Sequence, residues 1–378
     1  MDRNRSGKIM TQSQQFLLTL VRMSLWGTVE SLPETAPDWE EVLSLAHKQT
    51  LIGLVAEAVP MLPDHLKPAP QLRLKLHATA MRIVRSHVLL DRKVAEITTR
   101  MSANGIDSVI LKGQGTALNY PNPQSRQCGD IDLYVGEKNF GRCLEILLPD
   151  SGRTESDFKY IKHFDIEEDG VVIEVHRVAE MLPSAKTDKF FQDWTKDCLE
   201  TSRLRKVCIG GSTVNLPPAE FDAVYIMYHA WHHFLSGGVG LRQLCDWTMH
   251  LHRFYDLVCV EELHEKLSDF DLLVAWKVFA CVAVSYLGLP AEQCPLYDSL
   301  YNVKAERVMQ VIWDEGNFGK YSSAARNKRP DGYVAGKLYS LRKNTLRLYR
   351  VIAVSPSEVM KSWFSYFYKG FRNLLKKL

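Results

Sequence analysis

Two aspartates inside an apolar run constrain the fold of this chain more than any other feature. Asp130 and Asp132 stand two positions apart in the segment GDIDLYV, residues 129–135. A short run of this kind predicts a strand, and on a strand both carboxylates project from one face. Neighbouring carboxylates repel each other, and burying both without a partner is costly. A divalent cation removes that conflict, and Mg²⁺ prefers hard oxygen ligands of this kind.

A third carboxylate is expected near this pair. Glu174 lies in a second β-branched run, VVIEVHR, and shares its predicted strand face with Val172 and His176. Three carboxylates on adjacent strands can hold two metal ions roughly 3.5–4 Å apart, the geometry for in-line displacement at phosphorus. The alternative is that Glu174 forms a plain salt bridge with Arg177 or Arg126. His176 is expected to orient its neighbours rather than to act as a general base.

A glycine-rich turn precedes the aspartates. The segment KGQGT, residues 112–116, follows a predicted strand at 108–111 and opens a short predicted helix. Glycines in such a turn let backbone N–H groups approach a phosphate, and a helix N-terminus favours an anion. The dinucleotide-binding fingerprint fails because its third glycine position holds Leu118, and no GKS or GKT completes a Walker P-loop. Lys112 and Arg126 are candidates for phosphate contacts, or they are solvated surface residues.

The hydrophobic periodicity changes twice along the chain. Before residue 104, apolar residues recur at helical spacing over 16–26, 39–59 and 72–101. Between 105 and 214, β-branched runs predict strands at 108–111, 131–135, 164–167 and 171–176, a helix at 138–148 and a hairpin turn at 169–170. After the proline pair at 217–218, helices are expected at 219–235, 241–252, 261–288, 297–313, 333–353 and 357–378. The expected fold class is therefore α+β, a small mixed β-sheet flanked by N- and C-terminal helical regions.

Together these motifs resemble the nucleotidyltransferase superfamily with the DNA polymerase beta-like fold, and within it a bacterial family of uncharacterised nucleotidyltransferases. The resemblance rests on strand–KG–helix, then R…GDIDLYV, then a later strand with IEVH, over about residues 106–180. It implies Mg²⁺-dependent transfer of a nucleoside monophosphate from an NTP to a hydroxyl, with release of pyrophosphate. Asp130 and Asp132 match the family's metal-binding DxD pair, Glu174 its third carboxylate and Gly113 the glycine of its triphosphate-binding turn.

The donor-binding turn departs from the family's usual pattern. Where the superfamily has Gly-Ser or Gly-Gly, this chain has Lys112-Gly113 followed by Gln114. A second glycine loop at 237–240 leads to Arg242, which either reaches the donor's phosphates or forms an i, i+4 surface pair with Asp246. The residues expected to bind the nucleotide are Lys112, Gly113, Gln114, Arg126, His229, Arg242 and Asp246.

A histidine-rich helix at 219–235 is expected to complete the nucleotide cleft. His229 with His232 or His233 has the spacing that can chelate zinc, but no HExxH motif is present. Aromatic helices with several histidines more often form the wall of a core or a pocket. We therefore interpret this helix as a pocket wall, with His229 as a site candidate.

Cysteine usage and hydropathy indicate a reduced, cytoplasmic protein. The eight cysteines are spread singly with no CxxC pair, which excludes a zinc ribbon, an iron–sulfur ferredoxin, a thioredoxin-type site and a disulfide scaffold. The most apolar run, 272–289, contains Lys277 and predicts a buried core helix rather than a membrane span. No small-residue cleavage site follows the apolar stretch near the N-terminus, which argues against a signal peptide.

The formal net charge of +3 hides a basic C-terminal tail. Residues 320–378 contain fourteen Lys and Arg against two acids, whereas residues 1–319 carry 33 basic and 42 acidic side chains. On a wheel of 357–378, an apolar aromatic stripe lies opposite the basic residues. This helix either docks on the acidic body or lies peripherally on an anionic membrane. Nucleic acid is not an expected partner, because no RNP, KH or RGG signature is present.

Four regions follow: an N-terminal helical region (1–104), a nucleotidyltransferase catalytic core (105–214), a helical region that completes the cleft (215–320) and a basic helical tail (321–378). The expected enzyme uses two Mg²⁺ ions and an NTP donor, with a small molecule, a glycan precursor or a protein side chain as acceptor. The alternatives are a catalytically degenerate protein that binds a nucleotide or a partner, and a membrane-peripheral component of surface-polysaccharide assembly.

Overall fold

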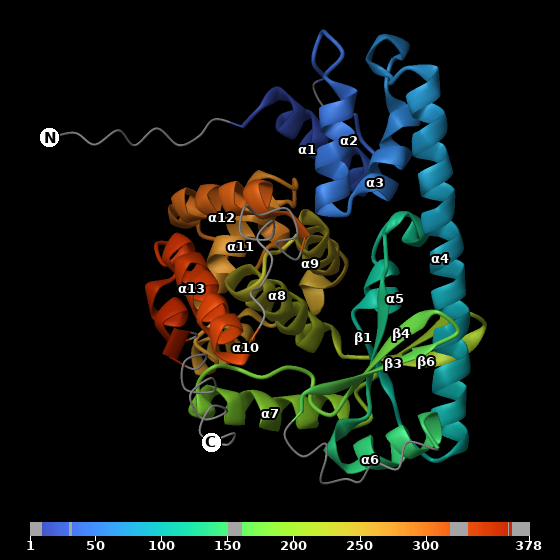
Figure 1. The fold of residues 1–378 in the computed structure, drawn as a ribbon, viewed down its shortest axis with the longest axis vertical. Helices are drawn as coiled ribbons and strands as arrows, with labels where there is room; N and C mark the ends of the chain where they lie inside the picture. Colours follow the sequence, from blue (N-terminus) through green and yellow to red (C-terminus); the bar gives the residue numbers. More distant parts are fainter. Residues whose placement is uncertain (1–9, 30–31, 150–160, 318–331, 362, 365–378) are drawn as a thin grey trace, which may run out of the picture.

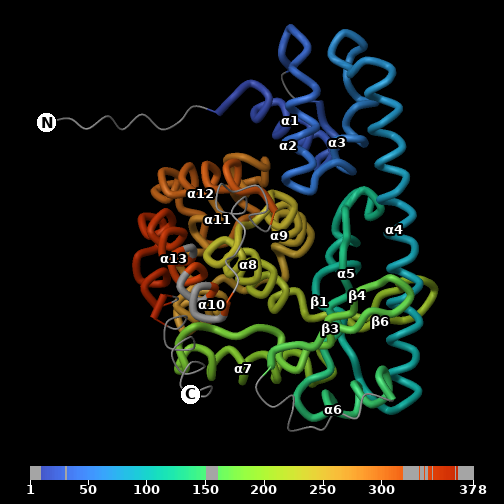
Figure 2. Tube along the Cα trace, in the orientation of Figure 1, coloured from blue at the N-terminus to red at the C-terminus, as the bar shows by residue number. Residues whose placement is uncertain are grey.

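The computed structural model describes residues 10–29, 32–149, 161–317, 332–361 and 363–364 (Figures 1 and 2). Its N-terminal helices are α1 (Gln12–Trp26), α2 (Trp39–Gln49), α3 (Ile52–Ala58) and α4 (Pro70–Ala103). The prediction of one helix over 39–59 is wrong, because Thr50 takes a φ of 60° and ends α2. A residue in the left-handed conformation cannot continue a right-handed helix, so α2 ends there and a new helix, α3, follows.

Helix α4 runs along one side of the molecule and joins its two hydrophobic cores (Figure 1). With 34 residues it is about 50 Å long. Its first half supplies Leu76 and Ile83 to a large core built mainly by helices. Its second half packs against the sheet through Leu90, Val94, Ile97 and Met101.

The expected mixed sheet is confirmed. Its four strands lie in the order β1 (Val109–Leu111), β2 (Asp130–Tyr134), β4 (Val171–His176) and β3 (His163–Glu168). Strands β2 and β4 are parallel, and the other pairs are antiparallel. The predicted turn at 169–170 is also confirmed, since Asp169 and Gly170 have φ values of 53° and 73°, as a two-residue hairpin turn requires.

Helices follow the first two strands of this sheet, and β5 and β6 form a separate two-stranded sheet. Helix α5 (Gly113–Ala117) follows β1, and α6 (Gly136–Leu147) follows β2. Helix α7 (Ala185–Leu199) and the hairpin of β5 (Arg205–Ile209) and β6 (Ser212–Leu216) were not among the predicted elements. Gly210 and Gly211 form the turn of that hairpin with positive φ values of 58° and 87°. The alternating residues Val214 and Leu216 pack into the core of the sheet.

The C-terminal region is helical again: α8 (Ala219–Ser236), α9 (Leu241–Phe254), α10 (Val260–Asp269), α11 (Leu273–Ser285), α12 (Asn302–Glu315) and α13 (Tyr333–Val351). The prediction of one helix over 261–288 is wrong, because Asp271 takes a φ of 60° between α10 and α11. Helix α11 is buried in the large core, as the sequence predicted. Among the described residues, no helix is both long and apolar enough to cross a membrane.

The basic tail, residues 321–378, is described over 332–361 and 363–364. Residues 318–331 and 365–378 are not described, so the amphipathic wheel of 357–378 stays a prediction. The described part of this segment begins with helical residues 356–361. There Glu358 is buried and accepts a hydrogen bond from the Trp231 indole N–H on α8.

Candidate active site

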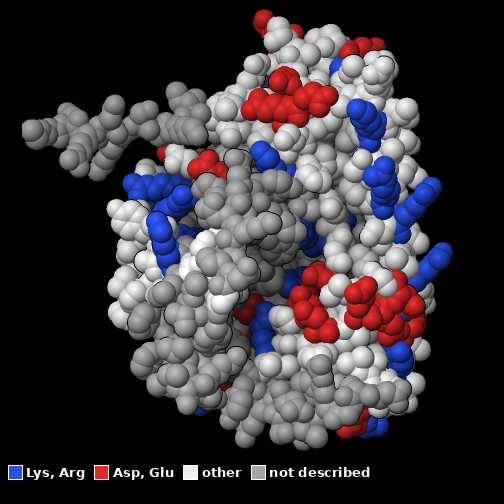
Figure 3. All heavy atoms as spheres, in the orientation of Figure 1, with Lys and Arg blue, Asp and Glu red and all other residues white. Residues whose placement is uncertain are grey.

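A polar cavity lies between the sheet and the C-terminal helices. Its floor is formed by the residues at the end of β1 and the start of β2, including Lys112, Gly113, Asp130 and Asp132. Helices α8 and α9 form the opposite wall, with His229 and Arg242 among the lining side chains. Figure 3 shows acidic and basic side chains gathered on this face of the molecule. Parts of the chain more than 100 residues apart therefore meet around one opening.

The predicted carboxylates meet in this cavity. Asp130 and Asp132 project from β2, and the register of the parallel pair places Asp132 directly beside Glu174 on β4. All three line the same opening. The alternative salt bridges for Glu174 are wrong, because Arg177 instead pairs with Glu137 on α6. Arg126 is likewise engaged elsewhere, by Asp246 on α9.

Asp132 is buried and held by two cationic or polar neighbours. Its Oδ1 lies 3.0 Å from Lys112 Nζ and 3.0 Å from His176 Nε2. Burial by itself raises the pKa of this carboxyl, but the Lys112 ammonium and the His176 imidazole outweigh it, so the pKa is held well below its ordinary value. Asp132 is therefore ionised.

Asp130 has a different environment. Burial and the nearby Asp132 charge raise its pKa, despite the opposing effect of Lys112. None of the described residues forms an ion pair with it, although it lies in a cavity with two other carboxylates. Its charge is therefore crowded by like charges, which is the condition that a bound cation relieves.

Lys112 reaches Asp132 through a strained backbone. It has a φ of 51° and a ψ of −138°, a region that residues with a side chain rarely occupy. Its Nζ also lies 3.3 Å from His229 and over the Tyr225 ring, 5.7 Å from the ring centroid. The surrounding contacts therefore fix this ammonium at the wall of the cavity.

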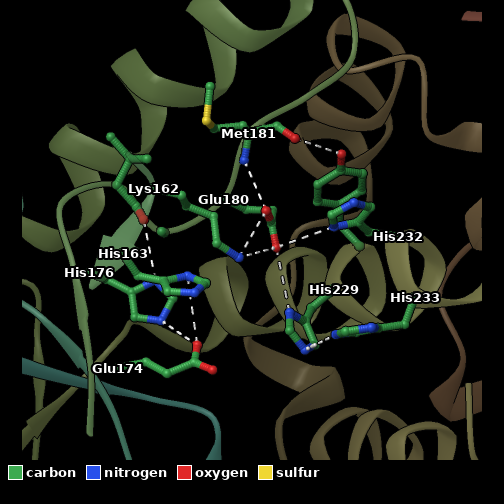
Figure 4. Close-up of polar contacts among 12 residues, drawn as sticks. Lys162, His163, Glu174, His176, Glu180, Met181, His229, His232 and His233 are labelled. Carbon is green, nitrogen blue, oxygen red and sulfur yellow. Dashed lines mark hydrogen bonds and ion pairs between the residues drawn. The ribbon is translucent and has the colours of Figure 1, made fainter. Parts of the chain in front are cut away.

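Glu174 is bracketed by two histidines (Figure 4). Its Oε2 lies 3.4 Å from His176 Nε2 and 3.7 Å from His163 Nδ1. His176 is fully buried and bridges Glu174 to Asp132, so its predicted role as an orienting residue fits this placement. His163, at the start of β3, is directly opposite His176 in the antiparallel register. No sequence motif pointed to His163.

A second buried carboxylate, Glu180, lies between Lys162 and the histidines of α8 (Figure 4). Its carboxylate oxygens lie 3.3 Å from Lys162 Nζ, 3.5 Å from His229 Nδ1 and 3.7 Å from His232 Nδ1. Burial raises its pKa, but these histidines and Lys162 lower it well below its ordinary value. The pKa of His229 is lowered by burial and by Lys112, so this imidazole is neutral. No sequence pattern indicated Glu180 or Lys162.

Arg126 and Asp246 join the β-sheet unit to helix α9. Arg126 Nε and Nη2 each lie 2.7 Å from one oxygen of Asp246, in a bidentate geometry. Tyr120 donates to the same carboxylate at 2.6 Å, and Arg242 approaches it at 3.4 Å. The Arg242–Asp246 pair exists, but Asp246 is buried and the pair is not a surface pair. All but Tyr120 line the cavity.

Only part of the predicted phosphate-binding turn, residues 112–116, lines the cavity. Gly113 lines the cavity, but a Cβ added to Gly115 would lie 2.6 Å from Leu216, so this glycine permits close packing against β6. Gln114 is buried and its amide donates to Asp91 on α4 at 3.3 Å. The residues that line the cavity do not include Gln114.

Two groups of described His, Cys, Asp and Glu side chains are close enough to hold an ion: His163 with Glu174 and His176, and Glu96 with Glu168 and Asp169. In the second group, Lys93 Nζ contacts all three carboxylates at 2.7–3.3 Å and already fills their centre. The histidines of α8 belong to neither group of three. His229 Nε2 and His233 Nε2 do lie 3.0 Å apart, but among the described residues they are not part of a set of three such ligands.

Comparison with known proteins places the chain among nucleotidyltransferases. Residues 35–288 match the sequence model of a family described as "Uncharacterised nucleotidyltransferase". Among solved structures, the chain is similar to an antigenic nucleotidyltransferase-like protein from Paracoccidioides brasiliensis. The match has 14% identity and a TM-score of 0.29, and covers 58% of this chain and 95% of that one. No curated protein matches the sequence.

Proposed function

This chain belongs to the family of uncharacterised nucleotidyltransferases, and from that membership we propose that it transfers an NMP from an NTP to a hydroxyl group. The acceptor oxygen would form a bond to the α-phosphorus while the bond to the bridging oxygen breaks and pyrophosphate leaves. The proposed acceptor is a small molecule, a glycan precursor or a protein side chain. We further propose the DNA polymerase beta-like superfamily as the wider relationship, residues 105–214 as the catalytic core, and the cytoplasm as the location.

The observation that carries this proposal is the convergence of Asp130, Asp132 and Glu174 in one cavity. Their oxygens are the ligands that Mg²⁺ prefers, and both burial and the neighbouring Asp132 charge raise the pKa of Asp130. The donor set therefore fits Mg²⁺, and these three residues would hold it. When bound, Mg²⁺ would neutralise triphosphate charge and stabilise the attacking and leaving oxygens.

Cationic side chains in the same cavity suit a triphosphate. Lys112, Lys162 and Arg242 line it from three separate parts of the chain. Each is held by a buried carboxylate, Asp132, Glu180 and Asp246 respectively. An ammonium or guanidinium positioned before the substrate arrives loses little conformational entropy on contact with phosphate oxygens. Lys112 would exchange Asp132 for a phosphate when the metal binds Asp132.

One observation favours a second candidate, a catalytically degenerate protein that binds a nucleotide or a partner. Lys112 Nζ and His176 Nε2 each lie 3.0 Å from the same oxygen of Asp132, so an internal cation already neutralises a predicted metal ligand. If Lys112 keeps this position, Asp132 is not available to Mg²⁺. The role of such a protein at a membrane surface in polysaccharide assembly would depend on the tail outside the described residues.

The test is nucleotide binding and turnover by the full chain. Calorimetry with each of the four NTPs, with and without Mg²⁺, and an assay of pyrophosphate release would be applied to wild type, Asp130→Ala and Asp132→Ala. Glu167→Gln is the matched control, because Glu167 is an exposed acid on neighbouring strand β3. The proposal expects Mg²⁺-dependent binding and pyrophosphate release in wild type and the control, and loss of release in both alanine variants.

The outcomes separate the two candidates. Binding of an NTP that persists in Asp130→Ala and Asp132→Ala, with no pyrophosphate released by wild type, supports the degenerate protein and contradicts the enzyme. Full turnover in either alanine variant would show that the carboxylates are not the metal ligands. Absence of binding for all four NTPs would overturn both candidates.

A further inference from the structure

We propose that His163, Glu174 and His176 form a binding site for a divalent transition-metal ion such as Mn²⁺ or Zn²⁺. The site shares Glu174 with the carboxylate set described above but adds two nitrogen donors. It does not depend on the proposed nucleotidyl transfer, because its argument uses only the donors on β3 and β4 and their surroundings. These are strands of one hairpin, and the register sets His163 opposite His176 and Asp165 opposite Glu174.

The separations of the donor atoms suit one ion. Glu174 Oε2 lies 3.4 Å from His176 Nε2 and 3.7 Å from His163 Nδ1, and all three atoms lie within 4.8 Å of one another. Donors about 2.1 Å from an ion in a tetrahedral arrangement lie about 3.4 Å apart. The two distances from Glu174 therefore match the edges of a coordination polyhedron, and the separation of the two nitrogens is at most 4.8 Å.

The ring of His176 is oriented as a metal-ligating histidine would be. Its Nδ1 lies 3.3 Å from the carbonyl oxygen of Val178, which can only accept, so Nδ1 carries the proton. Its Nε2 then points at the oxygens of Glu174 and Asp132. An unprotonated Nε2 lone pair facing two carboxylates is unfavourable unless a proton or a metal lies between them. The side chain is fully buried, so the ring cannot turn away into solvent.

The ring of His163 has the same arrangement. Its Nε2 lies 3.4 Å from Asp165 Oδ1, and its Nδ1 is buried without a hydrogen-bond partner among the described residues. Metal-ligating histidines characteristically donate the second ring N–H to a carboxylate or a backbone carbonyl. His176 has such a partner in the Val178 carbonyl, and Asp165 lies within ion-pair distance of the outer nitrogen of His163. The two remaining nitrogens converge on Glu174.

The chemistry of the donors selects the class of ion. Two imidazole nitrogens and one carboxylate suit Zn²⁺, Mn²⁺ and similar ions, whereas Mg²⁺ prefers oxygen ligands alone. The other acidic group of the described residues provides a contrast. Its centre is filled by Lys93. The two lysines that line the same cavity as His163 and Glu174 are instead held by other carboxylates, Lys112 by Asp132 and Lys162 by Glu180.

The test uses the full chain, purified without a histidine tag and freed of metal by a chelator. Mn²⁺ and Zn²⁺ would be titrated separately by calorimetry in the absence of nucleotide. The electron spin echo of the Mn²⁺ complex would then be examined for modulation by ¹⁴N, which reports directly coordinated imidazole. The variant is His163→Gln, since His163 is only partly buried, and the control is His264→Gln on the exposed face of α10. Melting temperatures would verify that both variants fold.

The expected result is one ion per wild-type chain with ¹⁴N modulation, and binding weakened at least about tenfold in His163→Gln but not in His264→Gln. Equal affinity in His163→Gln, or a Mn²⁺ signal without ¹⁴N modulation, would overturn the proposal. Asp130→Ala keeps all three donors and should still bind the ion. Metal binding with no turnover of any NTP would therefore contradict the proposed enzyme and leave this site standing.

Discussion

The buried pair of Arg126 and Asp246 gives a quantitative prediction that distinguishes its two ends. Asp246 accepts from Arg126, Tyr120 and Arg242, whereas Arg126 has Asp246 as its one carboxylate partner among the described residues, with Cys128 Sγ 2.8 Å away. Arg126 is 3% exposed and Asp246 5% exposed. Removing one partner of a buried pair costs about 3–5 kcal/mol, because the other charge is left uncompensated.

The two substitutions should therefore differ in cost. Asp246→Asn leaves the buried Arg126 without a counter-charge and also weakens Arg242 and Tyr120, so we expect a loss of about 4–5 kcal/mol in the free energy of unfolding. Arg126→Met leaves Asp246 with its bond from Tyr120 and its approach to Arg242, so we expect about 2–3 kcal/mol. The double variant should cost less than the sum of the two by about 1–3 kcal/mol.

The assay is urea unfolding at pH 7.5, followed by tryptophan fluorescence. Lys189→Met is the control, because Lys189 and Asp193 form an exposed pair at 3.2 Å with side chains 75% and 59% exposed. Loss of this surface pair should lower the free energy of unfolding by less than about 0.5 kcal/mol. The reasoning is refuted if Asp246→Asn costs less than Arg126→Met, or if neither costs more than the surface control.

Three further predictions concern packing and pH. Gly53→Ala should lower the free energy of unfolding by about 1–3 kcal/mol, because the new Cβ would lie 1.9 Å from the Ser125 carbonyl oxygen. Thermal unfolding measures this loss, and Gly237→Ala is the control because its Cβ would lie in open space. Burial lowers the pKa of His250 to about 3, so only the unfolded chain takes up its proton as the pH falls through 6.5. Stability should then drop by about 2 kcal/mol by pH 5, and His250→Gln should flatten that slope in unfolding titrations. Burial raises the pKa of Glu358 to about 8, so between pH 4.5 and 8 the folded chain keeps a proton that the unfolded chain loses. The free energy of unfolding should therefore fall as the pH rises through this window. Glu358→Gln should remove roughly 1.4 kcal/mol per pH unit from that fall in the same titrations.

The hairpin of β3 and β4 has a register that follows from its turn. A two-residue turn at Asp169-Gly170 fixes the register of both strands, and counting back from it pairs His163 with His176. The β-branched pattern predicts a strand from 164, whereas β3 begins one residue earlier, at His163, and this extra residue is the one that reaches Glu174. The boundary of a strand is set partly by what packs on its end, which local residue preferences do not report.

The two wrong helix predictions, over 39–59 and 261–288, have a similar origin. The breaks at Thr50 and Asp271 were missed because neither is glycine, although both adopt positive φ. Helical periodicity continued across both positions, since the apolar faces on either side pack into the same core. Which residue leaves the helical conformation is decided by the neighbouring elements, and the pattern of apolar residues is unchanged by it.

The sequence by itself determined the α+β fold class, the strand that carries Asp130 and Asp132 on one face, and the buried helix α11. These follow from the period of side-chain direction in strands and helices, which is a local property of the backbone. Tertiary structure alone decided which charges meet: Lys112 on Asp132, Lys162 on Glu180, and Arg126 on Asp246. Such pairs depend on strand register and on how helices from distant segments close over the sheet. Many charged residues compete for each partner in the chain, and only packing selects among them.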